Sequence, residues 1–196
     1  METKNYIIGI DLFCGAGGMS LGAKQAGIEV VYAVEKCPIA AATYKLNFPK
    51  TPIFVGDIKL VNSLPDDTKG ACKVLFGGPP CQGFSTSNQR TRNSLNHDNW
   101  MYKEFIRLAW QWKPDWIILE NVKGIRETSG GMFFSAITNG LESIGYSIST
   151  RILNAARFGV PQKRERAFIV GSRRKNSYTF PSEFLSIKSQ LSDLIE

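Results

Sequence analysis

Cys81 is the residue of this sequence whose surroundings most clearly suit chemistry. It follows an apolar run, two glycines and two prolines in the segment VLFGGPPCQGFSTS, residues 74–87. Proline fixes the backbone and lacks an N–H donor, so this turn cannot lie inside a helix and holds the cysteine in place. A thiolate held in this way can act as a nucleophile that forms a covalent intermediate. The turn therefore predicts a catalytic cysteine.

The other cysteines, Cys14, Cys37 and Cys72, stand in no comparable turn. We expect these three to be small buried residues and all four thiols to be free. No two cysteines have CxxC spacing and His97 is the single histidine, so the sequence predicts no metal site.

Glu120 is the candidate acid that accompanies the cysteine. With Asn121 it ends the apolar run WIILENV, residues 116–122. A Glu-Asn pair after a strand usually forms only a turn. Beside a cysteine held by prolines, however, it indicates a nucleophile and an acid that face one pocket.

Three features at successive strand ends predict a nucleotide site. Gly15, Gly17 and Gly18, in DLFCGAGGMSLG, form a turn through which backbone can approach a ligand. Glu35 follows about 20 residues later, where a carboxylate is expected to bind ribose hydroxyls. Asp57 ends IFVGD and could accept a hydrogen bond from an adenine amino group. Nicotinamide and S-adenosylmethionine cofactors both fit these features, but the spacing departs from G-x-G-x-x-G, which favours an adenosine ligand without phosphates.

The elements that position these residues follow from alternating apolar runs and segments of helical period. We expect strands at 6–13, 29–35, 52–57, 73–78, 116–122 and 166–172, and helices at 17–26, 38–48, 100–112 and 133–144. This order predicts a doubly wound, mostly parallel α/β sheet covered on both faces, with ligands beyond the carboxyl ends of the strands. The polar segment 82–99 resembles an active-site lid, and we expect it to be mobile or displaced when no substrate is bound.

Composition sets the class of protein. The chain has 196 residues, 43% of them apolar, which suits one domain with its own core. It shows no apolar run of about 18 residues and no signal-peptide layout, so we expect a cytoplasmic protein that has no membrane partner. The net charge of +7 favours a polyanionic partner. Cationic residues gather near the C-terminus around a single acid, Glu165: Arg157, Lys163, Arg164, Arg166, Arg173, Arg174 and Lys175.

Four segments together resemble the cytosine-5 DNA methyltransferase family. DLFCGAGGMSLG is similar to its cofactor loop, PPCQGFS to its nucleophile motif, ENV to its acid motif and GVPQKRERAFIVGSR to its Gln-x-Arg-x-Arg motif. They stand in the family's order and cover residues 6–175. The resemblance implies a Rossmann-like fold that binds S-adenosylmethionine and methylates double-stranded DNA.

The resemblance also implies a role for each matching residue. Cys81 would attack carbon 6 of a flipped cytosine, Glu120 would hydrogen-bond or protonate ring nitrogen 3, and carbon 5 would take the methyl group. Arg166 would lie nearest the base. Arg164 would lie nearer the phosphates. The implied DNA contacts are Gln82, Ser85 and Arg164, and the implied cofactor residues are Phe13, Gly15, Gly17, Gly18, Glu35, Asp57, Ile58, Pro80 and Met101.

Three further positions bear on these roles. Asn121 is expected to orient the turn that carries Cys81. Lys36 stands where many relatives carry a residue that packs on adenine, and Asp98 where an arginine often stands. These two departures put adenine stacking and the closed contacts of the lid in question.

Two alternative functions stay open. One is a tRNA cytosine methyltransferase, as in one branch of the family, although PPCQGFS looks more like the bacterial DNA-modifying members. The other is a non-catalytic, methyltransferase-like chain, against which the intact Cys81, Glu120 and Arg166 argue.

The family normally continues into a target-recognition region and two further motifs, which this sequence does not contain. We expect residues 1–196 to form a single catalytic and cofactor-binding domain, incomplete at its C-terminus. It would work as the catalytic subunit of a split enzyme with a second polypeptide, the rival being a truncated or decayed gene. Apolar surface around Met19, Leu21 and the first strand would then be uncovered.

Overall fold

The computed structural model describes residues 6–66, 70–80, 100–174 and 177–183. Cys81, Gln82, Ser85 and the expected lid lie outside the described residues. In the part of the chain that is described, no helix is long and apolar enough to cross a membrane.

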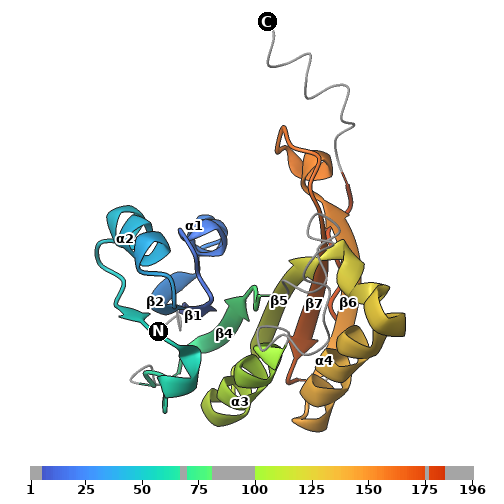
Figure 1. The fold of residues 1–196 in the computed structure, drawn as a ribbon, viewed down its shortest axis with the longest axis horizontal. Coiled ribbons are helices and arrows are strands. Elements are labelled where there is room, and N and C mark those ends of the chain that lie inside the picture. Colours follow the sequence, from blue (N-terminus) through green and yellow to red (C-terminus); the bar gives the residue numbers. More distant parts are fainter. Residues whose placement is uncertain (1–5, 67–69, 81–99, 175–176, 184–196) are drawn as a thin grey trace, which may run out of the picture.

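A seven-stranded sheet forms the centre of the molecule, in the order β3-β2-β1-β4-β5-β7-β6 (Figure 1). The first five strands run parallel, and β7 runs antiparallel to both of its neighbours. This confirms the expected α/β fold with a mostly parallel sheet. The strands are β1 (Ile7–Leu12), β2 (Glu29–Glu35), β3 (Ile53–Val55), β4 (Cys72–Gly77), β5 (Trp116–Val122), β6 (Ser147–Asn154) and β7 (Glu165–Ser172).

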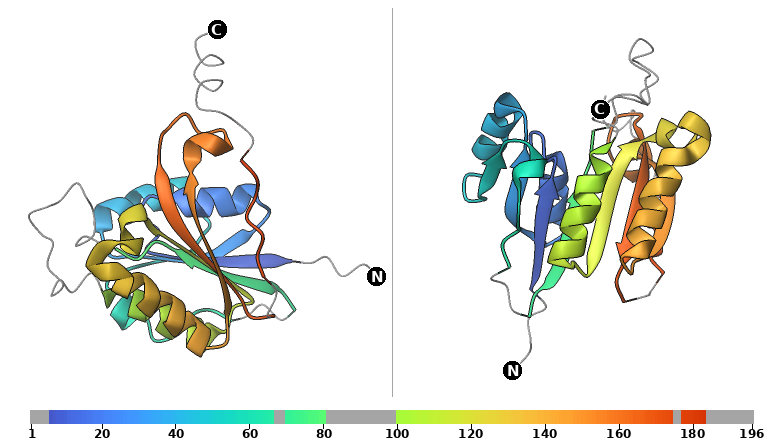
Figure 2. Two further views of the ribbon diagram at one scale, coloured as in Figure 1. Left: turned by 90° about the vertical axis from the view of Figure 1, so that its right-hand side faces the viewer. Right: turned by 60° about the horizontal axis from the view of Figure 1, so that its bottom comes forward.

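Two helices lie on each side of the sheet, as Figures 1 and 2 show. One side carries α1 (Gly18–Gln25) and α2 (Pro38–Asn47), and the other carries α3 (Tyr102–Trp112) and α4 (Met132–Ser143). The helix α3 packs against the sheet through one apolar face, because its buried residues recur every three or four positions. They are Tyr102, Phe105, Leu108, Ala109 and Trp112.

The core follows the alternation of side chains along β1. Ile8, Ile10 and Leu12 are completely buried in the main core, together with residues of α3 and α4. The residues between them face the α1 side. A Cβ added at Gly9 would lie 2.7 Å from the Phe76 ring, which packs with Met19 and Ala23 of α1. Asp11 is another of the residues between them, which directs it toward α1.

The strand β6 was missing from the sequence prediction, which placed only β7 after the last helix. None of its eight residues is buried, because it lies at the edge of the sheet, so it lacks the apolar run that reveals an interior strand. It pairs with β7 as an antiparallel hairpin whose connecting loop extends beyond the sheet, coloured orange in Figure 1. The loop begins with the short 3-10 helix η7 (Ala155–Phe158).

Candidate active site

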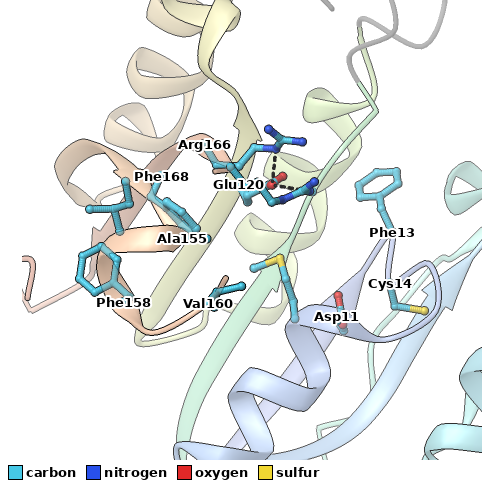
Figure 3. Close-up of a pocket in the computed structure, with 14 residues that line it drawn as sticks. Asp11, Phe13, Cys14, Glu120, Ala155, Phe158, Val160, Arg166 and Phe168 are labelled. Atoms are coloured by element: carbon cyan, nitrogen blue, oxygen red, sulfur yellow. Dashed lines mark ion pairs between the residues drawn. The ribbon is translucent and has the colours of Figure 1, made fainter. Parts of the chain in front are cut away.

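The loop after β1 bends through residues with left-handed backbone. The φ angle is 63° at Phe13, 55° at Gly15 and 97° at Gly17. For a residue with a Cβ this conformation is unfavourable, so Phe13 keeps it only because its surroundings hold it there. Its ring projects from the strand end into the space above the sheet edge (Figure 3). Residues 13–18 are called the glycine loop below.

Glu35, the last residue of β2, ties the glycine loop to its neighbouring strand. Its Oε2 accepts a hydrogen bond from the N–H of Gly15 at 2.8 Å, and its Oε1 accepts one from the N–H of Cys37 at 2.7 Å. Each carboxylate oxygen has a second lone pair. The side chain can therefore hold the loop and still accept hydrogen bonds from ligand hydroxyls.

Asp57 follows β3 and caps the short 3-10 helix η1 (Ile58–Leu60). Its Oδ1 accepts from the N–H of Lys59 at 3.0 Å, and its Oδ2 lies 3.6 Å from the Nζ of Lys36. The Lys59 N–H, helped by the Lys36 charge, holds the pKa of Asp57 below its ordinary value. Asp57 is therefore an ionised acceptor at neutral pH.

A pocket of about 200 Å³, the smaller pocket, joins the strand ends of β1, β2, β3 and β4. Six of the predicted cofactor residues line it: Phe13, Glu35, Asp57, Ile58, Pro80 and Met101. Lys36, the residue that departs from the family pattern, lines it too. The structure thus brings together side chains from five separate segments of the sequence.

A second pocket of about 580 Å³, the larger pocket, opens between α1 and the β6–β7 hairpin (Figure 3). Glu120, Arg164 and Arg166 line it, and so does Gly18. Phe13 and Gly78 line both pockets. A single ligand can therefore extend from one pocket into the other.

Glu120 is held in the larger pocket by two arginines from the start of β7. Its Oε1 lies 3.0 Å from the Nε of Arg166 and 3.6 Å from the Nη2 of Arg164. The Arg166 side chain is 25% exposed, compared with 49% for Arg164. Arg166 is therefore the stronger partner, because a closer and less solvated ion pair is screened less.

Asn121 connects the acid strand to the turn before Cys81. It is buried, and its Nδ2 donates a hydrogen bond to the carbonyl of Pro79 at 3.1 Å. The expectation that Asn121 orients this turn agrees with that contact. Pro80, the residue directly before Cys81, lines the smaller pocket.

Several predicted residues line neither pocket or lie outside the described residues. Gly15 and Gly17 belong to the glycine loop but line neither of the two pockets. Cys81, Gln82 and Ser85 are not among the described residues. Their roles stay predictions from the sequence.

The expected burial of the three remaining cysteines is right for Cys14 alone. Cys14 is 7% exposed and lines the larger pocket, whereas Cys37 is exposed and Cys72 is half-buried. Cys37 is the residue that directly precedes α2. Burial raises the pKa of Cys14 and of Cys72, which disfavours the thiolate form of both.

Sequence reasoning missed Asp11, which also lines the larger pocket. It is 1% exposed, and its Oδ2 accepts from the Oγ of Ser20 at 2.6 Å, while its Oδ1 has no hydrogen-bond partner among the described residues. Burial raises its pKa to about 7, an effect that the Ser20 hydrogen bond partly opposes. The signal was present, because an acid inside the apolar strand YIIGIDLF is unusual.

The apolar wall of the larger pocket was also missed. It comes from the β6–β7 hairpin and consists of Leu153, Ala155, Phe158, Val160 and Phe168. No local pattern could identify these residues, since they meet the glycine loop only after the hairpin forms.

Comparison with known proteins identifies the family. The model of the C-5 cytosine-specific DNA methylase family matches residues 7–195. Type II methyltransferase M.XorII of Xanthomonas oryzae is 38% identical over 178 residues, which are 85% of this chain and 41% of that protein. Type II methyltransferase M.AquIA of a Picosynechococcus species is 38% identical over 187 residues, which are 88% of this chain and 74% of that protein.

Solved structures agree with these sequence matches. A candidate DNA modification methyltransferase encoded within an Escherichia coli prophage superposes with a TM-score of 0.71 and 31% identity, over 86% of this chain and 47% of that one. DNMT2 of Spodoptera frugiperda superposes with a TM-score of 0.66 and 25% identity, over 89% and 52%. The chain spans less than half the length of M.XorII and M1.HphI, two curated relatives that it matches. Because the family model matches nearly the whole length of this chain, the chain belongs to the C-5 cytosine-specific DNA methylase family.

Proposed function

We propose that this protein transfers a methyl group from S-adenosylmethionine to carbon 5 of cytosine in DNA, through a covalent bond between Cys81 and the base. The observation that carries the proposal is the junction of the two pockets. The smaller pocket presents carboxylates suited to an adenosine, and the larger presents Glu120 with Arg166. Gly78, which lines both pockets, begins the turn that leads to Cys81.

The smaller pocket suits an adenosine that carries no phosphate. Glu35 and Asp57 are its acids, and Lys36, its one cation among the described residues, is already paired with Asp57. Such a site accepts hydrogen bonds from ribose hydroxyls and from an adenine amino group, but offers no free positive charge to a pyrophosphate. When bound, S-adenosylmethionine supplies the methyl group that carbon 5 receives.

The residues of the larger pocket would activate the base. The Cys81 thiolate forms a bond to carbon 6, and the electron pair of the carbon 5–carbon 6 double bond makes carbon 5 nucleophilic. Glu120 hydrogen-bonds or protonates ring nitrogen 3, and Arg166 holds the Glu120 carboxyl in place. The methyl transfer to carbon 5 releases S-adenosylhomocysteine. The proton on carbon 5 then leaves to solvent, the bond between sulfur and carbon 6 breaks and restores the thiolate, and the proton taken up at ring nitrogen 3 is given back.

Cys14 is the competing thiol, since it lines the larger pocket. Its burial raises its pKa, so little of it is thiolate at neutral pH. Cys81 instead follows a turn whose carbonyl at Pro79 is bonded by Asn121, next to the site that holds two arginines. This contrast supports Cys81 as the nucleophile.

Transfer of labelled methyl groups tests the proposed activity and its two alternatives. The protein, with and without a co-expressed partner, would be incubated with labelled S-adenosylmethionine and either duplex DNA or tRNA. Label in DNA that disappears in Cys81→Ser supports the proposal. Label confined to tRNA identifies the alternative substrate, and no label in either under all conditions identifies a non-catalytic chain.

We also propose that a second polypeptide completes the larger pocket. Leu21 on α1 is 51% exposed and Val160 on the hairpin is 45% exposed, while Met19 between them is half-buried and lines the pocket. The expectation that β1 itself is uncovered is wrong, because Ile8, Ile10 and Leu12 are fully buried. The exposed apolar side chains at the larger pocket therefore lie on α1 and the hairpin, and they suit an apolar segment of a partner protein.

A further inference from the structure

The last turn of α2 packs directly behind the glycine loop. Tyr44 and Phe48 form a small core of their own with Cys14 and Ala33, and their rings lie 4.8 Å apart between centroids. Tyr44 is completely buried and Phe48 is 9% exposed. This cluster is separate from the main core of the domain, and it contains Cys14 of the glycine loop. The cluster therefore supports the loop locally.

Two side chains of this turn hydrogen-bond the loop region on both sides of Gly17. Asn47 donates from Nδ2 to the carbonyl of Ala16 at 2.9 Å. Tyr44 places its hydroxyl 2.9 Å from the Oγ of Ser20, which lies in the first turn of α1. The α2 helix therefore holds the loop before its bend and after it.

The Tyr44 hydroxyl belongs to a buried chain of hydrogen bonds. Because the Ser20 hydroxyl donates its one proton to Asp11 at 2.6 Å, it accepts from Tyr44. The chain runs from α2 through α1 to β1 and ends at a carboxylate that lines the larger pocket. It links three elements that meet around the loop.

Gly17 shows how closely the loop follows this surface. A Cβ at this position would lie 2.4 Å from Cε2 of Phe48 and 3.0 Å from the Tyr44 ring, and the φ angle of 97° favours glycine as well. Gly17 precedes α1 and offers that helix no side-chain cap. The start of α1 is therefore set by α2 and not by a residue of its own.

We propose that Tyr44 and Asn47 are positioning residues for cofactor binding, which fix the glycine loop from behind without touching the ligand. Neither lines the smaller or the larger pocket. Their effect passes to the ligand through Phe13 and Gly18, which do line the pockets, and through the Gly15 N–H that pairs with Glu35. The proposal rests on the proposed S-adenosylmethionine site.

A matched pair of tyrosine variants tests the proposal. Tyr44→Phe removes the hydroxyl that bonds Ser20, and Tyr146→Phe removes another buried hydroxyl, which donates to the carbonyl of Pro114 at 2.7 Å, at the amino end of β5. Both variants lose a buried tyrosine hydroxyl together with its hydrogen bonding, and they should show similar falls in melting temperature. Only Tyr44→Phe should weaken binding of S-adenosylhomocysteine, by about threefold to tenfold, as measured by calorimetry.

A second variant covers the case in which Tyr44→Phe fails to fold. Asn47 is exposed, so Asn47→Ala should leave the melting temperature nearly unchanged and still weaken S-adenosylhomocysteine binding by about threefold to tenfold. Unchanged affinity in the folded variants, with normal binding by the unaltered protein, would overturn the positioning role alone. No binding by the unaltered protein would instead overturn the proposed cofactor site, and the positioning role with it.

Discussion

At the scale of single residues, Asp11 is the least usual feature of the site. A carboxyl that is 1% exposed, with one oxygen unpartnered among the described residues, is costly to ionise. Burial accordingly raises its pKa from about 3.8 to about 7. The folded protein therefore binds a proton at Asp11 at pH values where the unfolded chain has lost it.

This shift predicts a pH dependence of stability. Because the folded-state pKa is the higher one, the favourable contribution of the protonated Asp11 is complete below about pH 4 and is lost as the pH rises through about 7. Asp11→Asn removes the titration and keeps an acceptor for Ser20. Relative to the unaltered protein, we expect this variant to gain stability between pH 5 and pH 8, by roughly 2–3 kcal/mol.

Urea unfolding of both proteins at pH 5 and pH 8 measures this difference. If the unfolding free energies of the unaltered protein and Asp11→Asn differ by the same amount at both pH values, Asp11 does not titrate in this range.

Arg164 and Arg166 form a natural pair for comparison at the same scale. Both contact Oε1 of Glu120, but Arg166 does so at 3.0 Å and with half the exposure. If Arg166 holds the acid, Arg166→Met should lower methyl transfer by about 100-fold, and Arg164→Met by about tenfold or less in the same assay. Binding of S-adenosylhomocysteine should be unchanged in both. A larger loss of methyl transfer in Arg164→Met would reverse the assignment.

At the scale of elements, α3 and the residue before it contribute to the site at two places. Met101, just before its start, lines the smaller pocket. Arg107, further along, donates from Nη2 to the carbonyls of Val61 at 3.0 Å and Ile58 at 3.3 Å, while its Nε pairs with Glu104 at 2.7 Å. Arg107 thus holds the segment that carries Asp57 and Ile58.

Replacement of Arg107 should therefore loosen the adenosine side of the site. Arg107→Met keeps the apolar stem but removes both bonds to η1, and we expect about tenfold weaker S-adenosylhomocysteine binding by calorimetry. Arg126→Met is the control, since it removes the hydrogen bond from Arg126 to Thr150, and neither of these two residues lines either pocket. Equal affinities in the two variants would mean that η1 keeps its place without Arg107.

The elements also show what the sequence could and could not predict. The interior strands β1, β4 and β5 and the helix α3 carry continuous apolar runs or a clear helical period, so they were predicted to within a few residues. The edge strand β6 carries neither, because it packs on one neighbour and buries no residue fully. Its hairpin with β7, and the apolar pocket wall that the hairpin supplies, therefore escaped prediction.

The residues of the site also fall into those that the sequence could predict and those that it could not. Glu35, Asp57 and Glu120 were predicted because each stands at or near the carboxyl end of a strand, and the carboxyl ends of parallel strands share one sheet edge. The contacts of Tyr44, Asn47 and Arg107 join residues of different elements, and no spacing in the sequence reveals them.

At the scale of the whole molecule, the exposed apolar surface of α1 and the hairpin concerns the proposed need for a second polypeptide. If a second polypeptide covers Leu21 and Val160, the protein alone should show essentially no sequence-specific methyl transfer, and should bind DNA only through phosphate contacts that weaken steeply with salt. Leu21→Lys should then prevent activation by the partner while leaving S-adenosylhomocysteine binding intact. Vigorous sequence-specific methylation by the lone chain would contradict the need for a partner.

Covalent trapping tests the central claim most directly. The protein and its partner would be incubated with S-adenosylmethionine and duplex DNA that contains 5-fluorocytosine. The fluorine replaces the hydrogen that carbon 5 must lose as a proton, so the bond from sulfur to carbon 6 cannot break. We predict a denaturation-resistant adduct that mass spectrometry locates at Cys81, that forms in Cys14→Ala and that is absent in Cys81→Ser. An adduct that persists in Cys81→Ser would contradict the assignment of Cys81 as the nucleophile.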